Sequence, residues 1–144
     1  MPSDQHFRRL EHMYQSAPIN DYYMPTLTVE EGRARLQFDV RPDFFHAANA
    51  VHGSVYFKAL DDAAFFAANS LVEDVFVLTV TFNVELLRPV SSGTLTAEGR
   101  VLHASARLYA AESELRDSDG NVIGLGRGTF LPSSMALTPE VGYA

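Results

Sequence analysis

The chain has 144 residues, of which 47% are hydrophobic and 20% charged, a balance typical of one folded globular domain. Its net charge of −7 and its lack of a basic run argue against nucleic acid as a partner, because Lys and Arg are needed to neutralise phosphates. The absence of cysteine excludes disulfides, thiolate nucleophiles and thiolate metal ligands.

No apolar run approaches the roughly 20 residues that a transmembrane helix needs, so no membrane partner is expected. Residues 1–14 mix charged and apolar side chains and lack the uncharged stretch of a signal peptide. The sequence therefore predicts a cytoplasmic protein. Neither a metal-ligand cluster nor a phosphate-binding glycine pattern before a helix is visible, so we expect no metal and no separate cofactor.

The predicted elements begin with a short helix and a hairpin. Apolar side chains recur at helical spacing over about residues 4–15, which predicts an amphipathic helix that caps the domain. Two β-rich runs, 23–29 and 33–40, flank a turn and so predict a β-hairpin. His6 in the helix and His103 further along both have the pattern of surface residues.

An irregular segment at residues 43–51 leads to the central helix, predicted from Gly53 to about Ser70. This helix is apolar nearly all round, which indicates that other structure encloses it. The next run, 75–88, is a long strand of period two, with large apolar side chains at even positions and polar ones at odd positions.

Three more strands complete the predicted sheet, over residues 94–103, 107–115 and 122–131. The result is an α+β domain in which an antiparallel sheet of five or six strands wraps around one long helix. We expect a single domain over 1–144, with 1–20 as the N-terminal helix and lead-in and 133–144 as a C-terminal tail.

The spacing within the central helix carries the functional information. The turn His52-Gly53-Ser54 opens the helix, and Asp61 lies near its middle. A helix rises about 1.5 Å per residue, so the Gly53 N–H and the Asp61 carboxylate lie about 12 Å apart along the axis. They cannot hold one reacting group within one chain. If they cooperate, two copies of the helix must run antiparallel across a two-fold interface.

These motifs, together with Leu87-Arg88-Pro89 and Gly93, resemble the hotdog-fold acyl-CoA thioesterase superfamily, specifically its phenylacetate-pathway (PaaI-like) branch. The resemblance covers about residues 46–130. It implies homodimers whose sheets join through the long strand and which commonly pair into tetramers. It also implies acyl-CoA thioester hydrolysis at the interface, with the Asp-bearing helix from one subunit and the glycine turn from the other.

In such an enzyme the Gly53 N–H would stabilise the oxyanion, because unpaired donors and the helix dipole favour negative charge at a helix start. Asp61 would act as a general base toward water or attack the carbonyl itself. Simpler interpretations stay open. Gly53 could merely permit the turn, His52 could orient the turn or contact substrate, and either Asp61 or Asp62 could pair with Lys58 on the helix.

The resemblance also implies that Thr79 helps to hold the attacking water near Asp61. The alternation of the long strand conflicts with this role, since an apolar even face turned to the core would point Thr79 away from the helix. We favour the alternative in which the apolar row packs against another dimer.

The chain departs from the family pattern at two positions. Relatives commonly have Asn where this chain has His46, and Gly where it has Ser54. His46 can still donate a hydrogen bond or take a proton near neutral pH, and Asn49 could supply the missing amide. Ser54 and Asn49 are therefore expected near the substrate.

Coenzyme A is anionic, and it would be part of the substrate rather than a cofactor. Local cations must therefore bind it in this acidic protein. Arg88, Arg100 and Arg107 are the candidates, with Ser105 beside Arg107 at the start of a strand where relatives often contact the nucleotide. Alternatively, Arg88 only stabilises the turn at Pro89.

Three functions remain possible, of which thioester hydrolysis is favoured. The second is hydration or dehydration of an enoyl thioester, which would use His46 or His52 with Asp61. The third is a non-catalytic acyl-CoA sensor. Aromatic side chains around the helix favour a hydrophobic acyl group, either small and aromatic or of medium chain length, although a helix core needs such residues anyway.

Overall fold

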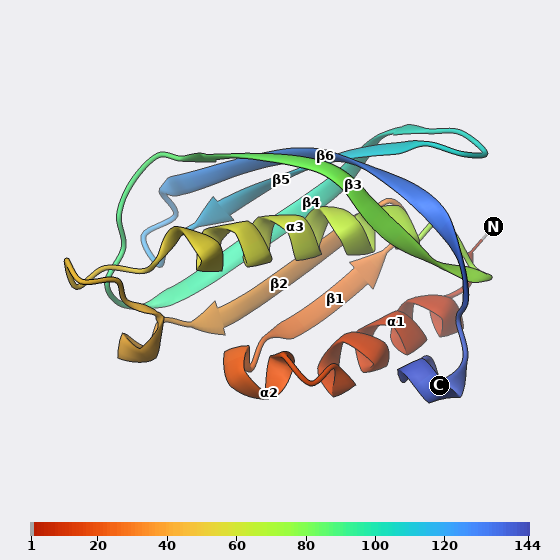
Figure 1. Ribbon diagram of the computed structural model, residues 1–144, viewed down its shortest axis with the longest axis horizontal. Helices are drawn as coiled ribbons and strands as arrows, with labels where there is room; N and C mark the ends of the chain where they lie inside the picture. The colour runs from red at the N-terminus through yellow and green to blue at the C-terminus, as the bar shows by residue number, and fades with distance from the viewer. Residues whose placement is uncertain (1) are drawn as a thin grey trace.

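The computed structural model describes residues 2–144 and has the predicted α+β order (Figure 1). The helices are α1 (Asp4–Ser16), α2 (Asn20–Tyr23) and α3 (Gly53–Asn69), with short 3₁₀ turns η1 (Pro42–Phe44) and η2 (Pro139–Val141). The strands are β1 (Thr26–Glu30), β2 (Arg33–Asp39), β3 (Val75–Leu86), β4 (Thr94–Ala104), β5 (Tyr109–Arg116) and β6 (Val122–Ala136).

All six strands form one antiparallel sheet in the order β1-β2-β4-β5-β6-β3, which curves around α3. The helix can lie close to the sheet because it carries alanines on its buried face and meets a glycine on β4. A Cβ at Gly99 would lie only 2.2 Å from the Ala63 carbonyl oxygen. This contact fixes the position of α3 against the middle of the sheet.

Helix α1 covers one edge of the sheet with its side chains. Arg8 donates to the Val29 carbonyl at 2.8 Å, and the Val29 N–H donates to the Glu11 carboxylate at 2.8 Å. The two side chains thus satisfy the outward N–H and carbonyl of Val29 in β1, which is one way in which proteins block an edge strand. Within residues 2–144, the other edge strand, β3, has a neighbour only on its β6 side.

A β-bulge in β3 resolves the conflict over Thr79. Thr79 pairs with Phe130 and Thr81 with Thr129, so Val80 is an extra residue that reverses the alternation. Val77 and Thr79 therefore face the helix before the bulge, and Phe82 faces it afterwards. The expectation of one continuous apolar row is wrong, because the bulge divides it, whereas packing of the exposed part against another dimer stays a prediction.

The even-numbered side chains of β3 accordingly have two different environments. Leu78 and Val80 are 51% and 55% exposed, whereas Phe82 packs into the core and fills the space above the glycines of β6. A Cβ at Gly128 would lie 2.4 Å from the Phe82 ring. The glycine stripe of β6 therefore accommodates an aromatic side chain of this chain.

Two expectations about the ends of the chain are wrong. Residues 133–136, expected in a C-terminal tail, extend β6, because the long β3 offers them a pairing partner. His6, expected on the surface, is buried, and its ring bonds the Tyr143 hydroxyl at 2.7 Å and the Asn69 carbonyl at 3.0 Å. These bonds fasten α1 to the end of α3 and to the C-terminal segment. His103 is exposed, as expected.

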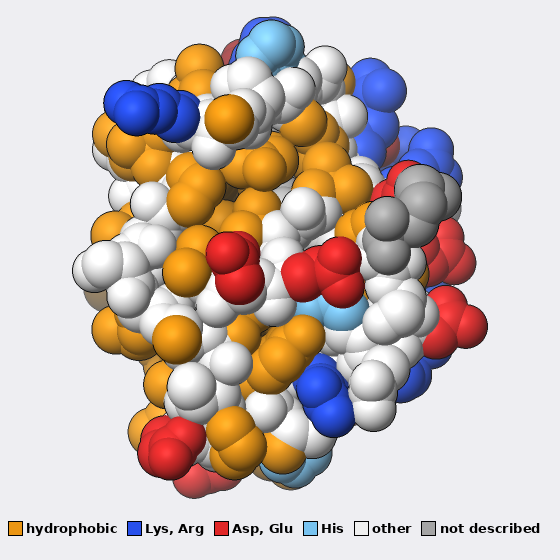
Figure 2. All heavy atoms as spheres, turned by 90° about the vertical axis from the view of Figure 1, so that its right-hand side faces the viewer, with side chains coloured by type: hydrophobic (Ala, Val, Ile, Leu, Met, Phe, Trp, Pro, Cys, Tyr) orange, Lys and Arg blue, Asp and Glu red, His pale blue; other side chains and the backbone are white. Residues whose placement is uncertain are grey.

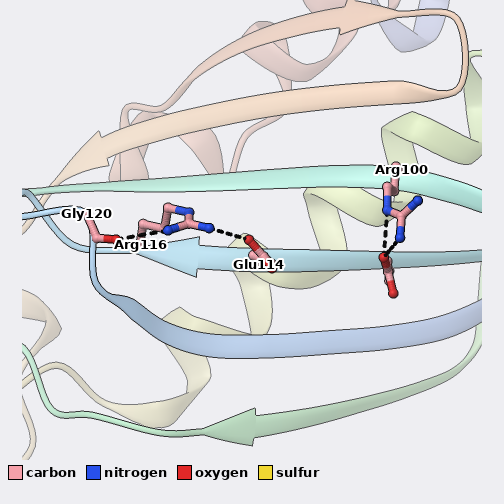
Figure 3. Close-up of polar contacts among 5 residues, drawn as sticks. Arg100, Glu114, Arg116 and Gly120 are labelled. Atoms are coloured by element: carbon pink, nitrogen blue, oxygen red, sulfur yellow. Dashed lines mark hydrogen bonds and ion pairs between the residues drawn. The ribbon is translucent and has the colours of Figure 1, made fainter.

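The outer face of the sheet is polar and carries one ion pair between strands and one within a strand (Figure 3). Arg100 pairs with Glu112 on the neighbouring strand, and Arg116 pairs with Glu114 and donates to the Gly120 carbonyl. Such exposed pairs contribute little to stability, about 0–1 kcal/mol each. Among residues 2–144, no helix is both long and apolar enough to cross a membrane.

Asn69 joins the end of α3 to the start of β3. Its buried side chain donates to the Val72 and Val75 carbonyls and accepts from the Val77 N–H. We predict that Asn69→Ala lowers the free energy of unfolding by about 2–4 kcal/mol, because buried backbone groups lose their partners. Urea unfolding checks this, with Asn83→Ala on the exposed outer face as a control that should change stability by less than about 0.5 kcal/mol. Equal effects of the two variants would contradict the assigned role.

Candidate functional site

Asp61 and Thr79 meet between α3 and β3. The Thr79 hydroxyl donates to the Asp61 carboxylate at 2.9 Å. Burial raises the pKa of Asp61 from 3.8 to about 6, an effect that the Thr79 hydrogen bond and Lys58 oppose and that Asp62 reinforces. The carboxylate is therefore mostly ionised at neutral pH but remains basic, as a general base requires.

The neighbouring carboxylate of Asp62 is already paired. It lies 2.5 Å from the Lys58 ammonium and accepts from the Tyr14 hydroxyl at 2.7 Å. The Lys58 ammonium also lies over the rings of Tyr14 and Tyr23. The sequence allowed either Asp61 or Asp62 to pair with Lys58, and in the structure Asp62 forms the ion pair.

The pair Asp61 and Thr79 lines a cavity of about 980 Å³. Its walls come from α1 and the residues after it, from α3 and β3, and from the C-terminal segment. We did not predict the contribution of α1, whose Met13 and Tyr14 form part of the wall. The apolar spacing in α1 indicated only that it packs, and not what it packs against. A second hollow, of about 470 Å³, lies among charged residues of β1, β2, β4 and β5 and contains Arg100 but neither Asp61 nor Thr79.

His52 holds the start of α3 as its N-cap. Its Nδ1 atom accepts from the Ser54 N–H at 3.0 Å and lies 2.9 Å from the Ser54 hydroxyl. The Gly53 N–H donates no hydrogen bond within residues 2–144. Gly53 has no positive φ, and an added Cβ would lie 3.0 Å from the Leu86 side chain. The turn itself does not require glycine at this position.

His46 and Asn49 lie in a tight exposed loop before the helix. The His46 Nδ1 atom accepts from the Ala48 N–H at 3.0 Å, and the Asn49 N–H donates to the His46 carbonyl. Asn49 has a φ of 62°, the left-handed conformation that Asn tolerates well. The loop is joined to the strand connection by a hydrogen bond from the Ser91 hydroxyl to the Asn49 carbonyl.

The predicted coenzyme A contacts do not come together in one chain. The Arg88 carbonyl accepts from the Tyr56 hydroxyl of α3 at 2.7 Å, which ties this residue to the first turn of the helix. Ser105 and Arg107 lie instead in the exposed β4–β5 turn, where the Ser105 hydroxyl bonds Leu108 backbone atoms. Arg100 lies on the outer face of the sheet, paired with Glu112.

One chain therefore assembles only part of the predicted site. Asp61 and Thr79 are in contact, whereas Gly53 and Asp61 belong to one continuous helix and lie about 12 Å apart along it. Across residues 2–144, no three His, Cys, Asp or Glu side chains gather as a metal ion would require.

A six-stranded antiparallel sheet around one long helix is the hotdog fold, and solved structures share it. The E. coli PaaI protein from the phenylacetic acid degradation operon superimposes with a TM-score of 0.86 at 21% identity, over 96% of this chain and 100% of that one. A structure named as a "putative esterase Rv1847/MT1895" from Mycobacterium tuberculosis gives a TM-score of 0.75 at 27% identity, over 81% and 97% of the two chains.

The sequence comparisons identify the family. A family model described as "Thioesterase superfamily" matches residues 48–123, more than half of the chain. The "Putative esterase Rv1847" of Mycobacterium tuberculosis is 32% identical over 98 residues, which cover 65% of this chain and 70% of that protein. The "Putative esterase SSO2140" of Saccharolobus solfataricus is 26% identical over 67% of this chain and 69% of its own length. The chain belongs to the thioesterase superfamily and shares its fold with the E. coli PaaI protein.

We predict that Asp61→Asn stabilises the protein at pH 8. Because the folded-state pKa is about 6 and the ordinary value is 3.8, ionised Asp61 costs the folded state up to about 3 kcal/mol above pH 6. The gain from Asn should shrink as the pH falls through 6 and vanish below about 4, where Asp61 is protonated in both states. Urea unfolding at several pH values and fixed protein concentration measures this.

Asp62→Asn is the matched control on the next residue. It leaves the Lys58 ammonium without its carboxylate and should lower the free energy of unfolding by about 2 kcal/mol at pH 8. If both variants destabilise the protein equally, the Asp61 carboxylate is structural and the distinction between the two residues fails.

Proposed function

We propose that the protein is an acyl-CoA thioesterase that hydrolyses the thioester of a small aromatic or medium-chain acyl-CoA at a dimer interface. The observation that supports this most directly is the Asp61 carboxylate, partly buried beside a large cavity, unpaired with a cation and hydrogen-bonded to Thr79. Family membership and the esterase names of the relatives point to the same chemistry.

The proposed reaction begins with attack on the thioester carbonyl. Asp61 takes a proton from water while the water oxygen forms a bond to the carbonyl carbon, with Thr79 keeping the carboxylate oriented. The tetrahedral oxyanion collapses, the C–S bond breaks, and the thiolate receives the proton. In the alternative route the Asp61 oxygen attacks first, and water then hydrolyses the mixed anhydride. Both routes release a carboxylic acid and the thiol of coenzyme A.

The oxyanion needs a hydrogen-bond donor that Asp61's own chain does not bring near it. The Gly53 N–H is free within residues 2–144 and lies at a helix start, where one such donor is worth about 3 kcal/mol in the transition state. Its separation from Asp61 along α3 favours a donor from a second copy. We therefore assign Asp61 and Thr79 of one subunit and the His52-Gly53-Ser54 turn of the other to one site.

Sheet pairing through β3 is the proposed route to the dimer. The β1 edge is covered by Arg8 and Glu11, whereas β3 has a free side and is twelve residues long. Two β3 strands that pair about a two-fold axis run antiparallel, and so do the two α3 helices. The end of the molecule that holds the start of β3 carries many hydrophobic side chains (Figure 2), which suits further pairing into a dimer of dimers.

The histidines suit hydrogen-bond donation better than proton abstraction. Backbone N–H groups donate to Nδ1 of both His46 and His52, so each neutral ring carries its proton on Nε2. Neither ring then presents a free basic nitrogen, which disfavours the enoyl hydratase. His46 with Asn49 and Ser54 is assigned to substrate contact, and His52 to holding the helix start. Arg88, Ser105 and Arg107 are the proposed contacts to coenzyme A.

The direct test is thiol release from a panel of phenylacetyl-, benzoyl- and straight-chain acyl-CoA substrates. We expect turnover by the wild type and at least a thousandfold loss of kcat/KM in Asp61→Asn, which keeps the shape but cannot take a proton. Wild-type kcat/KM should fall about tenfold per pH unit below pH 6, because protonated Asp61 is inactive. Acyl-CoA binding without thiol release from any member would support the sensor and contradict this proposal.

Mixed dimers test whether the site is shared. Gly53→Pro removes the N–H at the first helical position, where proline is best tolerated, and Gly53→Ala is the control that keeps the N–H. Asp61→Asn and Gly53→Pro should each be inactive alone. Unfolded and refolded together, they should regain about a quarter of wild-type activity, since half of the dimers are mixed and each has one intact site. No recovery from demonstrably mixed dimers would contradict a shared site.

A further inference from the structure

The cavity beside Asp61 is larger than a reacting thioester needs. Its volume of about 980 Å³ lies near the upper end of the range of about 300–1,000 Å³ that ligand pockets occupy. Asp61 and Thr79 form only a small part of its lining. The remaining space is large enough to hold a part of the substrate beyond the thioester group itself.

The walls of this space are mainly apolar and come from segments far apart in the sequence. Met13 and Ile19 line the α1 side, Phe65 lies one turn beyond Asp61 on α3, and Met135 lies at the end of β6. The Phe65 ring packs on the Phe76 ring at 5.1 Å. We name this space, between α1 and α3 and bounded by β3 and η2, the α1–α3 groove.

The charged groups of the groove are compatible with an uncharged occupant. Lys58 and Asp62 neutralise each other, with side chains only 14% and 18% exposed. His12 and Glu140 are exposed at the rim. Asp61 is thus the remaining partly buried charge, at the position where hydrolysis would take place.

The rim of the groove leaves apolar surface in contact with water. Ile19 and Met135 are 56% and 53% exposed, although both line the groove. The C-terminal segment closes one side, where the Gly142 carbonyl lies 2.7 Å from the His12 ring nitrogen Nδ1. An apolar chain in the groove would cover these rim side chains without displacing a polar contact.

We propose that the acyl chain of the substrate extends from Asp61 along the α1–α3 groove, so that straight medium-to-long acyl groups are preferred over compact aromatic ones. This inference rests on the proposed function and narrows its substrate class. Each methylene buried is worth about fourfold in affinity or in kcat/KM. The value of kcat/KM should therefore rise steeply from acetyl- to decanoyl-CoA and exceed that for benzoyl-CoA.

The specificity test places a bulky ring in the groove. Met135→Trp should lower kcat/KM for decanoyl-CoA at least tenfold and that for acetyl-CoA less than twofold. Leu131→Trp is the matched control, because it lies on the same strand, is 38% exposed and does not line the groove. It should keep the wild-type profile. Ile19→Trp provides a second groove variant from the opposite wall.

A binding readout separates this inference from the proposed function. The chain has no tryptophan, so each variant carries a single indole. Titration of Ile19→Trp with S-decyl-CoA, a thioether that cannot be hydrolysed, should shift the indole emission to the blue, whereas S-ethyl-CoA should not. The same titration of Leu131→Trp should leave the emission unchanged.

The possible outcomes distinguish a failure of the acyl-chain groove from a failure of the proposed thioesterase activity. A blue shift with S-decyl-CoA but no thiol release from any substrate would uphold the groove and contradict the thioesterase. Thiol release with kcat/KM independent of chain length, as expected if a second copy fills the groove, would overturn the groove and leave the thioesterase intact. A Met135→Trp defect equal for acetyl and decanoyl substrates would also overturn it.

Discussion

The close contact between α3 and the sheet is the constraint on which the rest of the structure depends. The Ala63 carbonyl lies so near Gly99 that no side chain would fit between them, and the sheet curves around α3. A helix held this closely has little freedom to slide or rotate, because packed interiors are dense. The start of the helix and its middle are thereby fixed as two separate positions, about 12 Å apart.

Burial around this helix gives two adjacent carboxylates different chemical characters. Asp62 lies toward α1, where Lys58 and Tyr14 satisfy it, and this cluster fastens the N-terminal helix to α3. Asp61 lies toward β3, where its hydrogen-bond partner among residues 2–144 is the neutral Thr79 hydroxyl. Burial raises the pKa of Asp61 to about 6. A carboxylate that is partly desolvated but not neutralised by a cation has a raised pKa and is a stronger base, and catalytic carboxylates commonly have this property.

The β-bulge at Val80 connects the sheet to the site. Without the extra residue, strict alternation would turn either Thr79 or Phe82 away from the helix. With it, Thr79 reaches Asp61 and the Phe82 ring fills the space above Gly128. Around the bulge, Leu78 and Val80 of the edge strand β3 are exposed. The bulge therefore affects both the Asp61–Thr79 contact and the surface where a second copy is proposed to pair.

The sequence by itself determined the elements, the enclosed helix and the family, because hydrophobic periodicity and the motif from His52 to Asp61 are local patterns. It also determined that Gly53 and Asp61 cannot meet within one chain, since helix geometry depends only on their spacing. It could not determine which carboxylate pairs with Lys58, that Val80 forms a bulge, that His6 is buried, or that α1 forms a wall of the cavity. Each of these depends on side chains brought together from distant parts of the chain, such as Tyr14 with Asp62 and Thr79 with Asp61. Only the tertiary structure decides those contacts. The local sequence is compatible with several partners for each side chain, and strand register and helix packing determine which partner it meets.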